Sequence, residues 1–208
     1  MDNNQIIECV PNFSEGVNLS VINAITDEIE RIDGVKILNI DPGKTTNRTV
    51  VTFVGAPQPV IDAAFLAIKK AGELIDMSRH KGEHPRMGAT DVCPLIPIAN
   101  ISMDETAGWA RKLARRVGEE LSLPVYLYEY AQPDKTRSNL SVIRTGEYEG
   151  FAEKIKLPQW KPDFGPARFD EKRGATAIGA RDFLIAYNVN LNTTSTRRAN
   201  SVAFDVRE

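Results

Sequence analysis

The stretch VKILNIDPGKTTNRTVVTFV, residues 35–54, decides the fold class. It contains two apolar runs of strand length, 35–40 and 48–54, joined by a polar turn that holds Pro42 and Gly43. Short apolar runs on either side of a proline–glycine turn predict two consecutive strands. Segments with helical spacing of apolar residues lie before and after this pair. A strand pair between two helices is the centre of the split βαβ pattern.

The segments around the strand pair complete this pattern. The helix before it has an apolar face made of Ile22, Ile25, Ile29 and Ile32. Ser20 is its predicted N-cap, and Gly34 ends it. The helix after the pair begins near Pro57, because proline is favoured in the first helical turn. Strands at 5–11 and 92–98 give the order strand, helix, strand, strand, helix, strand, and the polar residues after the first strand are expected to form a loop.

This order predicts an α+β protein with a ferredoxin-like βαββαβ sandwich. Pro94 and Pro97 favour an edge or irregular position for the last strand of the pattern. Beyond that strand, Ser102 and Glu105 form a predicted capping box at the start of another helix. Residues 125–130 then alternate as a further strand, so we expect an extra helix and strand to extend the sandwich.

The C-terminal part of the chain predicts the start of a second unit. A helical segment is expected at 140–155, and the Pro/Gly-rich stretch 158–179 is read as a linker or a binding loop. A strand at 183–191 and a helix at 199–206 then begin a second, similar subdomain. The predicted domains are residues 1–179 and residues 180–208, the second of them truncated.

Composition excludes several classes of function. The chain has 208 residues, 26 basic and 28 acidic side chains and a formal net charge of −2, whereas nucleic-acid binders are usually more basic. No apolar run approaches the roughly 18 residues of a membrane span, and the first residues do not form a signal peptide. Cys9 and Cys93 lie in apolar runs, which predicts reduced, buried thiols in a cytoplasmic protein.

The densest group of chemistry-bearing side chains is the stretch SRHKGEHPRMG, residues 78–88. It contains both histidines of the chain, His80 and His84, among several cations. A neutral imidazole can take up and return a proton near neutral pH, and cations around it attract carboxylates and keep it unprotonated. A solvated basic loop is the alternative interpretation, but Gly82 and Pro85 indicate a fixed backbone shape.

No metal or nucleotide site is predicted. The two histidines have the i, i+4 spacing of ligands on a helix, but the glycine and proline around them disfavour a helix and no third ligand is near in sequence. Residues 43–45 read Gly-Lys-Thr, but Leu38 occupies the position where a P-loop needs its first glycine. Asp41, at the end of a predicted strand, remains a candidate functional carboxylate.

Seven strings of the sequence resemble the formiminotransferase domain family. In chain order they are residues 8–16, 46–50, 75–89, 91–94, 124–128, 160–166 and 174–177. The string IDMSRHKGEHPRMGA, which runs through both histidines, is the most specific. The resemblance implies transfer of the formimino group from N-formimino-L-glutamate to tetrahydrofolate as co-substrate. The products are 5-formiminotetrahydrofolate and glutamate, in histidine degradation.

The resemblance also implies roles for particular residues. The histidine that matches His84 is the catalytic acid and base of the family, and the aspartate that matches Asp41 lies near it. The implied folate-binding stretch is Gly165, Pro166, Ala167, Arg168, Phe169, Asp170, Glu171, Lys172, Arg173 and Gly174. Family members pair this subdomain with a second one of comparable size.

Six polar residues are substrate-binding candidates: Asn12, Asn47, Arg48, Arg79, Lys81 and Arg86. Arginine is suited to bidentate pairing with substrate carboxylates. We expect a homodimer in the full-length form, with no metal, nucleic acid or membrane partner. A non-catalytic folate or small-molecule binding relative is the alternative function. An RNA-binding ferredoxin-like domain is disfavoured by the charge and by a third strand without the aromatic sheet motif.

Overall fold

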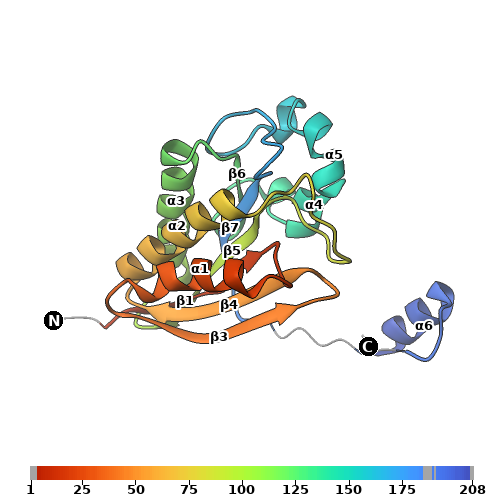
Figure 1. The fold of residues 1–208 in the computed structure, drawn as a ribbon, viewed down its shortest axis with the longest axis horizontal. Helices are drawn as coiled ribbons and strands as arrows, with labels where there is room; N and C mark the ends of the chain where they lie inside the picture. The colour runs from red at the N-terminus through yellow and green to blue at the C-terminus, as the bar shows by residue number, and fades with distance from the viewer. Residues whose placement is uncertain (1–3, 185–188, 190, 207–208) are drawn as a thin grey trace.

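The computed structural model describes residues 4–184, 189 and 191–206 (Figure 1). Its centre is a mixed seven-stranded sheet. The strands are β1 (Ile6–Cys9), β2 (Asn12–Phe13), β3 (Val35–Gly43), β4 (Arg48–Gly55), β5 (Thr90–Ala99), β6 (Val125–Glu129) and β7 (Thr176–Ala180). The α+β class expected from the sequence is therefore confirmed, whereas the finer ferredoxin-like description stays a prediction.

The strand pairings define two halves of the sheet. Strands β1 and β2 follow one another along the same row, and both pair antiparallel with β4 on one side and β5 on the other. Strand β3 pairs antiparallel with β4 at the outside of this half. In the other half β7 runs parallel to β5, and β6 runs parallel to β7. Strand β5 therefore joins the two halves.

The helices cover the two faces of the sheet unequally. Helices α1 (Leu19–Glu30), α2 (Pro57–Leu74) and α3 (Met103–Glu120) pack on one face and form the main apolar core with it (Figure 1). On the other face, α4 (Leu140–Arg144) and α5 (Glu147–Lys154) cover only the half near β6 and β7, around Tyr126 and Tyr128. No helix among the described residues packs over the rest of that face, where a cavity opens beside β2, β3 and β4. Helix α6 (Thr196–Val206) has no buried residue, and two 3₁₀ turns span Lys135–Arg137 and Pro158–Trp160.

Local signals in the sequence predicted some helix ends and missed others. The capping box of Ser102 and Glu105 is confirmed at the start of α3. The cap of α1 is Asn18 rather than Ser20, because the Asn18 side chain accepts the Ser20 backbone N–H. The helical segment expected at 140–155 is two helices, since Gly146 adopts a left-handed backbone with φ of 87° between them.

The proline-containing strand β5 is the main correction to the predicted sheet. It lies inside the sheet, between β1/β2 and β7, rather than at an edge. Its irregularity, however, was predicted correctly. The neighbouring row is interrupted between β1 and β2, and there the Val10 N–H donates to the Pro94 carbonyl at 3.2 Å. Because the missing Pro94 N–H faces this interruption, an interior strand tolerates the proline.

The stretch 158–179 is also more than the linker or loop that the sequence suggested. It ends in β7, whose five residues are all buried between β5 and β6. Farther along, the helix expected at 199–206 is confirmed as part of α6. The strand expected at 183–191 lies largely outside the described residues.

Candidate functional site

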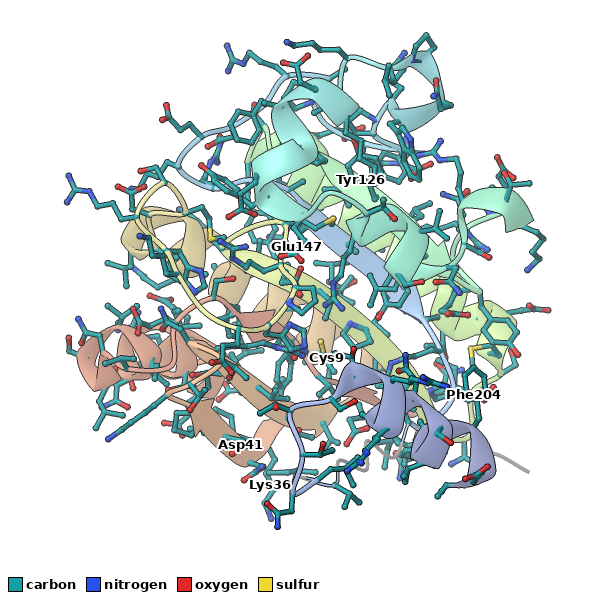
Figure 2. The ribbon with its side chains drawn as sticks, turned by 90° about the vertical axis from the view of Figure 1, so that its right-hand side faces the viewer. Cys9, Lys36, Asp41, Tyr126, Glu147 and Phe204 are labelled. Atoms are coloured by element: carbon teal, nitrogen blue, oxygen red, sulfur yellow. The ribbon has the colours of Figure 1, made fainter. Side chains whose placement is uncertain are left out.

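A cavity of about 560 Å³ opens on the face of the sheet that α4 and α5 leave partly bare. Asn12 on β2, Asp41 on β3 and Arg48 on β4 line one side, and His84 contributes from the loop before β5. Figure 2 looks toward this side of the molecule, with Asp41 on β3 and Glu147 at the start of α5. Arg144 from α4 lines the other side. The cavity thus collects cations, a carboxylate and an imidazole from distant segments.

The hydrogen bonds of His84 fix its tautomer. Its Nδ1 lies 2.6 Å from the Pro85 carbonyl oxygen, which can only accept, so Nδ1 carries the proton. Its Nε2 contacts Nη1 of Arg48, which can only donate, so Nε2 carries the lone pair. Burial, and next the Arg48 charge, lower the pKa of His84. The ring is therefore a neutral imidazole whose basic nitrogen points at a cation.

Arg48 joins two of the candidate residues. One terminal nitrogen donates to His84, and the other donates to the side-chain oxygen of Asn12. Its Nε is buried without a hydrogen-bond partner among the described residues. Both ends of the guanidinium are therefore engaged with the protein in this structure.

The other histidine, His80, has a different environment. Its Nε2 donates to the Asn47 carbonyl at 2.8 Å, and its Nδ1 accepts from Nε of Arg86 at 3.2 Å. Both ring nitrogens are thus used to hold the loop, and His80 does not line the cavity. Residue types and spacing alone could not separate the two histidines, whereas their hydrogen bonds do.

Asn47 and Arg86, both substrate-binding candidates, make hydrogen bonds that hold the loop in place. Asn47 has a φ of 46° and receives the Gly16 N–H on its side-chain oxygen, while its amide donates to the Lys81 carbonyl at 2.9 Å. Arg86 is buried and donates to both carboxylate oxygens of Glu149, at 2.7 and 3.0 Å. It also pairs with Glu147 at 3.2 Å. Neither Asn47 nor Arg86 lines the cavity.

The remaining candidates divide in the same way. Asp41 lines the cavity and is exposed, and no hydrogen bond between Asp41 and His84 is found within the described part of the chain. Arg79 and Lys81 are exposed and line no part of the cavity. The structure therefore brings together Asn12, Asp41, Arg48 and His84, and leaves the other substrate candidates outside.

Asp91 and Arg144 were not selected from the sequence. Asp91 is completely buried, and its Oδ1 accepts the Met87 N–H at 3.0 Å and Nε of Arg144 at 3.3 Å. Its Oδ2 accepts Nη2 of Arg144. One signal in the sequence could have pointed to Asp91: it is the only charged residue in the apolar or small stretch 89–96. A carboxylate buried in such a strand needs a partner.

The segment expected to bind folate, 165–174, lines no part of the cavity that holds His84. Its Phe169 packs against Tyr148 and Phe151 of α5. Its Asp170 accepts from the backbone and side chain of Arg173, and Arg173 also donates to the Leu121 carbonyl at 2.8 Å. The charged side chains of this segment are thus partly engaged in holding its own shape.

The described residues offer neither a cluster of side chains for a metal ion nor a helix for a membrane span. Among them no group of three or more His, Cys, Asp or Glu side chains is arranged to hold a metal ion. The described helices include none that is both long enough and apolar enough to cross a lipid bilayer.

Comparison with known proteins identifies the family of the chain. Residues 6–181 match the model of the formiminotransferase domain, N-terminal subdomain. A formimidoyltransferase-cyclodeaminase of Dictyostelium discoideum is 50% identical over 99% of this chain and 38% of its own length. Glutamate formimidoyltransferases of Thermoplasma acidophilum and Streptococcus pyogenes serotype M1 are 50% and 43% identical, over 97% and 98% of this chain and 67% and 68% of theirs. The chain thus spans well under half of the first relative and about two thirds of the other two.

Proposed function

We propose, for a chain that belongs to the formiminotransferase family, that it takes part in formimino transfer from N-formimino-L-glutamate to tetrahydrofolate. The products are 5-formiminotetrahydrofolate and glutamate, and the reaction serves histidine degradation in the cytoplasm. The observation that carries this proposal is the neutral imidazole of His84, with its basic Nε2 in a cavity lined by cations. A base with a lowered pKa is unprotonated near neutral pH, as the first proton transfer requires.

The reaction needs one proton to be moved between two nitrogens. The secondary amine of tetrahydrofolate attacks the formimino carbon, and a new C–N bond forms in a tetrahedral intermediate. We assign removal of the proton from that amine to Nε2 of His84. The imidazolium then returns this proton to the glutamate nitrogen while the old C–N bond breaks, with its electron pair on that nitrogen.

Arg48 and Asp41 modify this cycle through charge. Arg48 donates to Nε2 in this structure, so the incoming amine has to replace that donor before the proton can move. Asp41 lines the same cavity, and its carboxylate can balance the cationic charge of the intermediate. Asp41 is therefore proposed as the second catalytic residue.

The remaining parts of the proposal follow the family. Residues 165–174 are proposed to contact the folate, and residues 1–179 and 180–208 to belong to two subdomains. A homodimer is proposed for the complete protein. Because none of 165–174 lines the His84 cavity, we infer that folate bridges two separate surfaces.

The test of the function is a formimino-transfer assay with His84→Gln and, as the matched control, His80→Gln. Loss of general acid–base catalysis lowers turnover by about 10²- to 10⁴-fold, so we expect this loss at His84 and a smaller one at His80. Equal rates for His84→Gln and the wild type would refute the assignment. Folate binding without any turnover by the wild-type chain would instead favour the non-catalytic binding protein.

A further inference from the structure

We propose, on the basis of the function proposed above, that Arg144 binds a carboxylate of the glutamate moiety and that buried Asp91 positions it. Arg144 is the last residue of α4, on the side of the cavity opposite Asp41 and Arg48. It also lines an adjoining cavity of about 700 Å³ beside α4. Arg144 therefore borders both cavities.

The Asp91 contacts fix the orientation of this guanidinium. They use Nε and Nη2, which form one edge of the planar group. Within the described residues, no hydrogen bond of Nη1 is found, so this nitrogen remains for a ligand. Arg144 keeps 15% of its side-chain surface exposed, whereas Asp91 keeps none. Because Asp91 cannot be solvated, the pair cannot open without leaving a buried charge unpaired.

The other cations near His84 are engaged elsewhere. Arg86 is used by Glu149 and Glu147, and Arg48 is used by His84 and Asn12. Arg181 also lines the cavity, but its Nη1 donates to the Asp182 carbonyl at 2.8 Å. Its charge also acts on Glu8. Burial raises the pKa of the Glu8 carboxyl group, and the Arg181 charge opposes this effect. Arg144 is distinguished from these cations by the buried carboxylate of Asp91, which holds its guanidinium in one orientation at the cavity.

Two crossed ion pairs tie the proposed binding residue to the catalytic loop. Arg86, from the loop before β5, reaches Glu149 of α5, while Arg144 of α4 reaches back to Asp91 of β5. The Tyr148 N–H also donates to the Arg86 carbonyl at 2.9 Å. Helices α4 and α5 are thus fastened to the segment 86–91 in both directions, which keeps Arg144 at a fixed distance from His84.

Calorimetric titration with N-formyl-L-glutamate tests the proposal. This compound keeps both carboxylates and replaces the formimino nitrogen by oxygen, and in a titration without tetrahydrofolate there is no acceptor with which it can react. The wild-type chain should bind it, and its uncharged diethyl ester should not bind. Removing a hydrogen bond to a charged group costs about 1.5–3 kcal/mol, so Arg144→Met should weaken binding about 10- to 100-fold. Arg144→Lys should recover part of the loss.

Two further variants separate binding from stability. The double variant Asp91→Asn with Arg144→Gln replaces the ion pair by a neutral hydrogen-bonded pair. It leaves no buried charge unpaired, so it should fold even if Arg144→Met does not. Arg116→Met removes another aspartate-paired arginine, on the face covered by α1–α3, and should bind as the wild type does. If the variant with both Asp91→Asn and Arg144→Gln is folded and binds N-formyl-L-glutamate with wild-type affinity, the role of Arg144 is overturned and the proposed function is left intact. Failure of the wild-type chain to bind the dicarboxylate would overturn both.

Discussion

Gly82 allows the loop that carries His84 to approach the strand that carries Arg48 closely. A Cβ atom at residue 82 would lie 2.2 Å from the backbone oxygen of Thr46, whereas ordinary contact begins at 3.4 Å. Gly82→Ala must therefore separate the two backbones by about 1.2 Å. The segment 45–48 cannot yield easily, because the Gly16 N–H donates to the Asn47 side chain and Arg48 pairs with Gly43 between β3 and β4. The displacement therefore falls on the loop that ends in His84.

A displacement of this size is large for the proton transfer that we propose at His84. A misplacement of about 1 Å costs roughly 100-fold in rate, so turnover of Gly82→Ala should fall by about that factor while the fold is retained. The measurements are the formimino-transfer rate and the thermal unfolding curve of the same sample.

The matched control is Gly108→Ala, which makes the same substitution in α3. A Cβ at residue 108 meets no atom within 4 Å, and alanine is better than glycine in a helix by about 1 kcal/mol. Gly108→Ala should therefore keep full activity and unfold at a slightly higher temperature. Wild-type turnover in Gly82→Ala would refute the reasoning, because it would show that the loop adapts without moving His84.

Two further predictions concern charge in the same cavity. Arg48→Gln removes one of the two main causes that lower the pKa of His84, so that pKa should rise and the low-pH limb of the rate profile should move to higher pH. Because the chain has only two histidines, NMR of the imidazole protons can follow the titration of His84. An unchanged His84 titration would contradict the assigned contact. Arg144→Met leaves Asp91 buried without its partner and should lower the free energy of unfolding by about 3–5 kcal/mol. Adding Asp91→Asn should restore most of that loss in urea unfolding, and equal stability of the single and double variants would show that the pair is not coupled.

The sequence predicted those parts of the fold that depend on local pattern. The strand pair 35–54 and its flanking helices were found because apolar spacing and turn residues are local signals. Strand β7 was missed because its Thr-Ala-Ile-Gly-Ala sequence lies in a Pro/Gly-rich stretch and is buried only through its neighbours β5 and β6. The interior position of β5 was missed because the break in the neighbouring row that accommodates Pro94 lies more than 80 residues earlier in the chain.

The candidate site follows the same division between local and long-range information. A basic loop with two histidines is visible in the sequence, and it indicated proton transfer beside carboxylate recognition. Which cation is suited to a carboxylate ligand depends on where each arginine finds its partner. Arg86 is the most deeply buried cation of the loop, yet its partners Glu147 and Glu149 come from α5, some 60 residues later. Asp91 likewise finds Arg144 only 53 residues along the chain.

This pairing changes the meaning of the basic loop. Arg86, which looks available in the sequence, fastens α5 to the loop that carries His84, and His80 accepts a hydrogen bond from the same arginine. The same fastening brings Arg144, which no local pattern connects with His84, to the cavity. The Arg144 charge lowers the pKa of both His84 and Arg48, which is a physical sign of that proximity. A ligand carboxylate at Arg144 would offset this charge and raise the proton affinity of His84, so binding of the glutamate moiety would prepare the imidazole to accept the proton from the attacking amine.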